Sequence, residues 1–212
     1  MLVLSRLSGF WAGLFFVSVP VFFQAPLVRL WPGVSLLLTF LWLLGGYFCL
    51  RYNERAPWGD LILGFSWSWL AGSLYWGWLR SEPLWHLPIE AIGLPFALFA
   101  LWRGYLLVGH CFYLGSLLGT AMTDFYFYAL DLLPDWRRIM QADLQGSILI
   151  LHQAAERVQT LEGLVWGLVF VVALVAAGIA GLRANQFHWS VFSGAVLGTL
   201  LVDALFGLSA FL

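Results

Sequence analysis

The sequence predicts an all-α membrane protein, a polytopic transmembrane helix bundle with six to seven membrane segments. Of its 212 residues, 62% are hydrophobic and 10% are charged, whereas soluble domains average about 45–50% apolar and ~25% charged residues. Apolar stretches close to the ~20-residue length of a membrane-spanning helix recur along the chain. No water-soluble core could bury this much apolar surface. We therefore expect one integral membrane domain, residues 1–212, with the lipid bilayer as its first partner.

The same composition argues against several classes of function. The net charge is −1, so the chain lacks a basic surface for nucleic acid. Cys49 and Cys111 both lie in apolar segments, where small core residues are more common than a disulfide or a metal site. The sequence contains no Ser–His–Asp arrangement, Gly-rich phosphate loop or zinc-ligand spacing. Enzymatic chemistry therefore has little support, and no particular cofactor or metal is indicated.

The first candidate span covers about Gly9 to Val28. It contains Pro20 and Pro26, and a proline inside a membrane helix removes a backbone hydrogen bond. A kink or an early end near Val19 is therefore expected. The stretch has no small-residue cleavage site of the A-x-A kind, so we interpret it as a retained first span.

Three more candidate segments follow. The second covers about Gly33 to Leu50 and the third about Trp58 to Leu79. Small or polar residues recur along the third at helical spacing, which is typical of close helix contact in lipid: Asp60, Gly64, Ser68, Gly72 and Tyr75. The fourth, His86 to Trp102, contains Pro88 and Pro95. It is either a short kinked span, which we favour, or a re-entrant hairpin.

The second half of the chain predicts three spans and one polar region. The fifth segment covers about Gly104 to Leu130, the sixth Gly163 to Leu182, and the seventh follows Trp189 and ends at Leu212. Between the fifth and sixth, Pro134 to Thr160 has apolar residues at helical spacing among charged ones. This pattern predicts an amphipathic helix or pair of helices on the membrane surface, or else a solvated loop packed on the protein.

An internal repeat links the fifth and seventh segments. Gly115 to Asp124 reads GSLLGTAMTD, and Gly194 to Asp203 reads GAVLGTLLVD. One span separates the copies, so the two segments should run parallel and carry their aspartates towards the same side. Each copy also contains a GxxxG pair, which permits close approach of helix backbones. The predicted packing residues are Gly115, Gly119, Gly194 and Gly198.

The carboxylates of the repeat predict a functional site at membrane depth. A charged Asp at the centre of a spanning helix costs about 2.5–3.5 kcal/mol on insertion scales, and such residues usually mark ion pathways, proton relays or counter-ions. If the fourth segment spans, Glu90 reaches similar depth. The structural alternative is a pairing with Arg80 or Arg103. The predicted ligand- or ion-binding residues are Asp124, Asp203, Glu90, Thr120 and Thr199.

The four histidines, at positions 86, 110, 152 and 188, show no metal-ligand spacing such as HExxH. His110 precedes the first repeat copy by five residues and His188 precedes the second by six. An imidazole can ligate the magnesium of chlorophyll, and thirteen tryptophans would suit a pigment neighbourhood. His110 is therefore a possible pigment ligand, although a hydrogen-bonded structural histidine is the more common case.

Four stretches of the chain are distinctive. They are VPVFFQAPLVR (Val19 to Arg29), WGDLILGFSWSWLAGSLYWGWLR (Trp58 to Arg80), LPIEAIGLPFAL (Leu87 to Leu98) and FYLGSLLGTAMTDFYFY (Phe112 to Tyr128). Together they resemble a family of uncharacterised integral membrane proteins from cyanobacteria. The resemblance implies a photosynthetic host and a plasma or thylakoid membrane location. It implies no activity and no site residues.

Two functions from different classes stay open. The first is a transporter of a small solute or cation, or a substrate-binding membrane subunit, because such sites favour broken helices near the midplane. At 212 residues the chain is small for a stand-alone carrier, so a membrane-protein partner or a homo-oligomer is expected. The second is a non-catalytic assembly scaffold or pigment-associated factor of photosynthetic membranes, which the 18% aromatic content favours.

Overall fold

The computed structural model describes residues 5–209, which form helices joined by short turns. The α-helices are α1 (Arg6–Leu30), α2 (Pro32–Leu50), α3 (Ala56–Leu74), α4 (His86–Glu90), α5 (Leu94–Arg103), α6 (Leu107–Ala129), α7 (Leu133–Gln141), α8 (Leu144–Val158), α9 (Leu161–Arg183) and α10 (Phe187–Ser209). A π-helix, Tyr75–Leu79, extends α3. No strand occurs in the described residues, so the all-α class is confirmed there. Residues 210–212, the end of the seventh predicted segment, lie outside the described residues.

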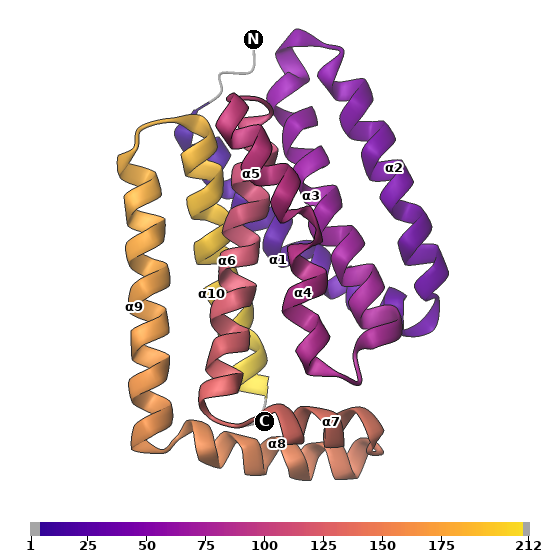
Figure 1. Cartoon of the computed structure of the whole chain (residues 1–212), viewed down its shortest axis with the longest axis vertical. Coiled ribbons are helices and arrows are strands. Elements are labelled where there is room, and N and C mark those ends of the chain that lie inside the picture. Colours follow the sequence, from indigo (N-terminus) through magenta and orange to yellow (C-terminus); the bar gives the residue numbers. More distant parts are fainter. Residues whose placement is uncertain (1–4, 210–212) are drawn as a thin grey trace.

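The long helices stand side by side, and two shorter helices cross one end of the bundle (Figure 1). α10 lies against α1, α6 and α9, whereas α3 lies between α2 and α6. α4 and α5 follow one another along α6. α7 and α8 cross the end at which the C-terminus lies, and the N-terminus lies at the opposite end. We call the end that α7 and α8 cover the C-terminal end.

Within the part of the chain that the structure describes, five helical segments are long and apolar enough to cross a membrane: Arg6–Leu30, Pro32–Leu50, Pro83–Arg103, Leu161–Arg183 and Phe187–Leu208. α3 and α6 are not among these five, although the sequence predicts a span at each. Both lie at the centre of the bundle and carry buried polar side chains, such as Asp60 and Ser73 on α3 and Asp124 on α6. Polar groups that face protein lower the hydropathy of a helix without exposing it to lipid.

α1 runs without interruption through Pro20 and Pro26, so the predicted early end near Val19 is wrong. Neighbouring helices commonly support the backbone around a proline in a membrane helix. Here the side chain of Gln24 lies between the two prolines and donates a hydrogen bond to the carbonyl of Trp69 on α3, at 2.8 Å. This contact ties the proline-containing turn of α1 to the bundle.

The fourth predicted segment runs in one direction, from the C-terminal end towards the opposite end (Figure 1). It therefore has the path of a span rather than that of a re-entrant hairpin, and Pro83–Arg103 is long enough to cross. Its helix is broken as the prolines predict. α4 has only five residues, a 3-10 turn covers Ala91–Gly93, and Pro95 lies at the start of α5.

The glycines of the repeat lie where helix backbones approach closely. A Cβ atom added to Gly119 on α6 would lie 2.1 Å from the hydroxyl of Thr199 on α10. One added to Gly194 on α10 would lie 2.0 Å from the carbonyl oxygen of Phe10 on α1. The GxxxG pair of α6 thus faces α10, and that of α10 faces α1. The other repeat glycines with such contacts are Gly115, against Phe192, and Gly198, against Val17.

A third close approach joins α3 to α6. A Cβ atom on Gly64 would lie 2.0 Å from the carbonyl oxygen of Gly109, and one on Gly109 would lie 2.1 Å from that of Asp60. The helices therefore pack in the order α3, α6, α10 and α1, and each neighbouring pair has backbone contacts that leave no room for a side chain. We call these four helices the central layer.

The polar stretch after α6 forms two helices, α7 and α8, that run across the C-terminal end (Figure 1). α7 is packed on the protein: Asp135 is 1% exposed and forms ion pairs with Arg138 and Arg157. α8 instead exposes apolar side chains, including Ile148 and Leu149. The stretch therefore forms the predicted pair of helices rather than a loop, of which α7 packs on the protein and α8 exposes an apolar face.

Candidate functional site: a buried carboxylate and imidazole cluster

Asp124 is the most deeply buried carboxylate of the repeat, with 3% of its surface exposed. Its Oδ1 atom lies 2.8 Å from Nδ1 of His86, which α4 carries at its first position. Its Oδ2 atom has no hydrogen-bond partner among the described residues. A buried carboxylate normally uses several acceptor positions, so half of this side chain is available for a further donor.

Aromatic rings surround the imidazole of His86. Its ring centre lies 4.4 Å from that of Tyr75 and 5.7 Å from those of Trp76 and Trp136. The hydroxyl of Tyr75 is buried and also has no hydrogen-bond partner among the described residues. The cluster thus contains one unpaired hydroxyl and one unpaired carboxylate oxygen.

The π-helix Tyr75–Leu79 carries two of these rings. A π-helical turn holds one more residue per hydrogen-bonded ring than an α-helical turn, and it occurs frequently at functional sites. The extra residue changes the direction of the side chains that follow it. Tyr75 and Trp76 are consequently neighbours in sequence that both contact the same imidazole.

Helix α7 covers the cluster at the C-terminal end. The indole of Trp136 stacks on Trp76 at 5.6 Å, and its Nε1 donates a hydrogen bond to the carbonyl of Arg80 at 3.0 Å. Next to it, Arg137 donates two hydrogen bonds to Glu82, at 2.7 and 3.1 Å. The guanidinium of Arg137 lowers the pKa of Glu82 below its ordinary value.

Glu90 and Asp203 complete the acidic group. Glu90 lies one turn after His86 on α4 and interacts electrostatically with both His86 and Asp124. Asp203 on α10 also interacts electrostatically with Asp124. Its Oδ2 atom accepts a hydrogen bond from the hydroxyl of Thr123 on α6, at 2.7 Å. The other two carboxylates predicted to converge, Glu90 and Asp203, are thus within electrostatic range of Asp124.

Three of the sequence-based assignments differ from the observed contacts. The hydroxyl of Thr199 donates to carbonyls of its own helix and packs on Gly119, while no hydrogen bond of Thr120 is among those described. Thr123 instead bonds to Asp203. Arg80 bonds to the carbonyl of Trp76, and Arg103 lies over the rings of Phe99 and Trp102, so neither arginine pairs with Asp124.

His86 is the site residue that sequence reasoning missed. Its position gave no ligand spacing, and its partner is 38 residues away. One signal in the sequence pointed to His86. It lies four residues before Glu90, which is one turn earlier if both are on the same helix. That relationship becomes visible only when the segment is known to start as a helix at His86.

Asp60, the other buried aspartate of the long helices, has a structural role. Its two oxygens accept hydrogen bonds from the backbone N–H groups of Val108 and Gly109, at 2.8 and 3.0 Å. These groups belong to the first turn of α6, where N–H groups have no partner within the helix. α6 has no side-chain cap of its own. Asp60 therefore caps α6 from α3.

His110, the possible pigment ligand, lies near the start of α6. Its Nδ1 atom is 2.7 Å from the carbonyl oxygen of Leu106, and a carbonyl only accepts, so Nδ1 carries the proton. Among the described residues, no group of three or more His, Cys, Asp or Glu side chains has an arrangement that could hold a metal ion. Cys49 and Cys111 form no disulfide.

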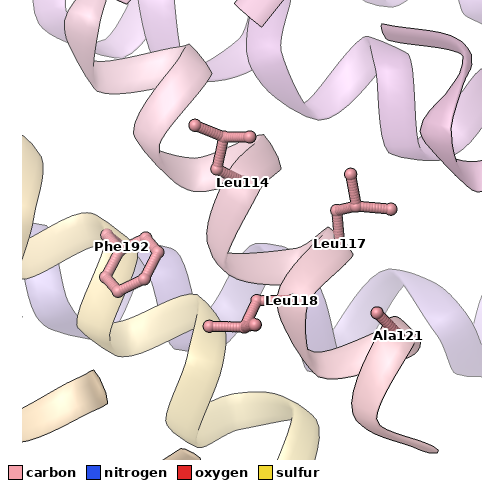
Figure 2. Close-up of a pocket in the computed structure, with 5 residues that line it drawn as sticks. All are labelled: Leu114, Leu117, Leu118, Ala121 and Phe192. Atoms are coloured by element: carbon pink, nitrogen blue, oxygen red, sulfur yellow. The ribbon is translucent and has the colours of Figure 1, made fainter. Parts of the chain in front are cut away.

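A separate apolar groove lies between α6 and α10 (Figure 2). Its volume is about 340 Å³, and its lining consists of Leu114, Leu117, Leu118, Ala121 and Phe192. None of these side chains is polar, so the groove has no direct part in the carboxylate cluster.

The fold and the site define an all-helical protein of the integral membrane class, with acidic side chains buried in its helix bundle. Among known protein families, the model described as "Protein of unknown function (DUF3120)" matches residues 13–211. The chain belongs to this family. Neither the comparison with curated proteins nor that with solved structures gives a match.

Proposed function

We propose that the protein transports a small solute or cation, or is the substrate-binding membrane subunit of such a transporter, and that the cluster around Asp124 is its binding site. In this proposal all seven long helical segments cross the membrane, including α3 and α6. The two copies of the repeat then carry Asp124 and Asp203 at corresponding depth on neighbouring parallel helices. The host membrane that we propose, on the sequence resemblance alone, is a cyanobacterial plasma or thylakoid membrane.

One observation carries the proposal: Asp124 is 3% exposed and has a single hydrogen-bond partner among the described residues, His86. A charge at membrane depth is costly, so it is kept where it pairs or serves an ion pathway. Asp124, Glu90 and Asp203 carry up to three negative charges, against one imidazole that can become positive. A bound cation would offset this excess, because neighbouring carboxylates in a low-dielectric site do not all ionise unaided.

The broken fourth segment also supports the proposal. Transporter sites commonly use discontinuous helices whose freed backbone groups face a substrate or an ion. Here α4, the 3-10 turn Ala91–Gly93 and α5 form such a helix, with His86 and Glu90 on α4. The chain is small for a carrier that works alone, so we propose that it acts with a membrane-protein partner or as a homo-oligomer.

The test is a flux measurement on the purified protein in sealed liposomes. Dyes for protons, sodium and potassium would report cation entry under an imposed membrane potential. We expect entry of at least one of these cations above the protein-free rate, and its loss in Asp124→Asn and Asp203→Asn. Glu156→Gln, which removes an exposed carboxylate on α8, is the matched control. Flux equal to that of empty liposomes for all three ions would contradict transport of these cations by the protein alone.

A pigment-associated scaffold is the second candidate, and the geometry of His110 favours it. With the proton on Nδ1, held by the Leu106 carbonyl, the lone pair of Nε2 is free for a metal, as in most metal-bound histidines. The absorbance spectrum of the protein purified from its host tests this function. Chlorophyll that co-purifies and is lost in His110→Gln, but retained in His152→Gln, would support it.

A further inference from the structure

We propose that the cation this site accepts is a proton and that His86 is the side chain that holds it, paired with ionised Asp124. The inference rests on the proposed function and names the species bound at the same site. Binding one proton from water converts neutral His86 and anionic Asp124 into an imidazolium–carboxylate pair. No other bond forms or breaks.

The contacts of His86 suit an imidazolium. Its Nδ1 lies 2.8 Å from Oδ1 of Asp124, a typical length for a charge-assisted hydrogen bond. The rings of Tyr75, Trp76 and Trp136 all have their centres within 6 Å of the imidazole centre. Aromatic rings within about 6 Å of a cation attract it electrostatically through their negative faces. Aromatic rings from the π-helix and from α7 therefore lie close to the imidazole on which the charge would form.

The unpaired atoms of the cluster indicate how a proton could arrive. Oδ2 of Asp124 and the hydroxyl of Tyr75 are both buried without a partner among the described residues. Asp124 also exerts the strongest electrostatic influence of any nearby charged group on the Tyr75 hydroxyl. A buried water needs two or more polar partners, and these two atoms supply an acceptor and a donor. A proton passed from such a water to the carboxylate would then cross the 2.8 Å hydrogen bond from Asp124 to Nδ1 of His86, which is unprotonated when the neutral ring carries its proton on Nε2.

The other charged or titratable groups around His86 either add negative charge or are already paired. Glu90 shares α4, Tyr128 lies on α6, and Asp203 on α10 interacts with Asp124. Glu82, before α4, is bound by Arg137 of α7. Arg80, which precedes α4, bonds to the backbone carbonyl of Trp76, and Arg138 of α7 pairs with Asp135. A protonated His86 would therefore have several acidic side chains as neighbours.

Nuclear magnetic resonance of protein labelled with ¹⁵N only in histidine tests this inference. The chain has four histidines, so His110→Gln, His152→Gln and His188→Gln assign three of them and leave His86 unchanged. We expect both ring nitrogens of His86 to carry protons within the range of about pH 5 to pH 8 in which histidine normally titrates. The second proton should be lost at a lower pH in Asp124→Asn than in the wild type.

A His86 ring with a single protonated nitrogen from about pH 5 to pH 8, the range in which histidine normally titrates, would overturn the inference. So would a titration of His86 that is identical in Asp124→Asn. Repeating the measurement with sodium replaced by choline separates the two proposals. If sodium displaces the proton and is also the ion that crosses in the flux assay, cation transport stands and the proton assignment fails.

Discussion

Nδ1 of His86 lies 2.8 Å from Oδ1 of Asp124, although the two residues are 38 positions apart in the chain. The first belongs to the broken fourth segment and the second to the first copy of the repeat. A buried carboxylate without a partner would be costly in a membrane helix. One hydrogen bond therefore connects the broken fourth segment to the first copy of the repeat.

This pair gives a prediction about coupling. Asp124→Leu or His86→Leu alone leaves the other polar side chain buried without its partner, which typically costs about 1–3 kcal/mol. The double variant removes both polar groups, so we expect it to be less destabilised than the sum of the single variants. Thermal unfolding in detergent measures all three. Strictly additive effects would show that the two side chains do not depend on each other.

The glycine contacts predict where a larger side chain cannot be accepted. Gly119→Leu and Gly198→Leu should lower thermal stability, because a Cβ atom alone would lie 2.1 and 2.4 Å from its neighbours. Overpacking of this kind typically costs about 1–3 kcal/mol. Gly45→Leu on α2 is the matched control, since nothing lies within 4 Å of its Cβ position. Equal melting temperatures for all three variants would contradict the packing role.

We expect Asp60 to affect the stability of the fold and not the cluster around Asp124 and His86. Asp60→Ala removes the cap on the first turn of α6, and loss of such a cap costs about 0.5–2 kcal/mol. We expect a lower melting temperature together with unchanged titration of His86, because Asp60 bonds to α6 near Val108, at the opposite end of that helix from Asp124. A stable Asp60→Ala protein with altered His86 resonances would contradict this assignment.

The ion pair between Glu82 and Arg137 predicts a dependence on pH at the surface of the bundle. The pKa of Glu82 is lowered in the folded protein from its ordinary value of 4.5. The pair therefore stabilises the position of α7 fully above about pH 4.5, and this contribution is lost as the pH falls through the lower, folded value. A spin label on Gln141→Cys, in a Cys49→Ser background, should become more mobile over that acidic range.

The control for this experiment is Glu82→Gln, which removes the charge and keeps the shape of the side chain. Its spin label should already be more mobile at neutral pH and should not change further on acidification. A label that responds to acid equally in both proteins would show that another group holds α7 in place.

Much of the fold follows from the sequence because the bilayer imposes a simple rule. Apolar stretches of about 20 residues form helices in lipid, and the fourth segment is broken at Ala91–Gly93, between Pro88 and Pro95. The prolines of α1 were a weaker guide. Proline removes one backbone bond, but α1 stays helical through both prolines, and Gln24 between them bonds to Trp69 on α3.

The site was only partly predictable. A carboxylate inside an apolar segment is visible in sequence because it is costly, which is why Asp124, Asp203 and Glu90 stood out. Their partners were less visible, because hydroxyls and imidazoles are common in helices and their direction depends on rotation about the helix axis. Thr123 rather than Thr120 or Thr199 binds Asp203. Thr120 and Thr123 are less than one helical turn apart on α6. The packing of α6 on α10 decides which of the two faces Asp203.

The central layer has a mechanical consequence. Its four helices touch backbone to backbone at positions such as Gly64 and Gly194, so they have no slack to slide or tilt independently. Asp124 and Asp203 lie on helices of this closely packed central layer. His86 instead lies on α4, a five-residue helix bounded by 3-10 turns. We therefore expect any change in the distance between the imidazole of His86 and the carboxylate of Asp124 to come from movement of α4.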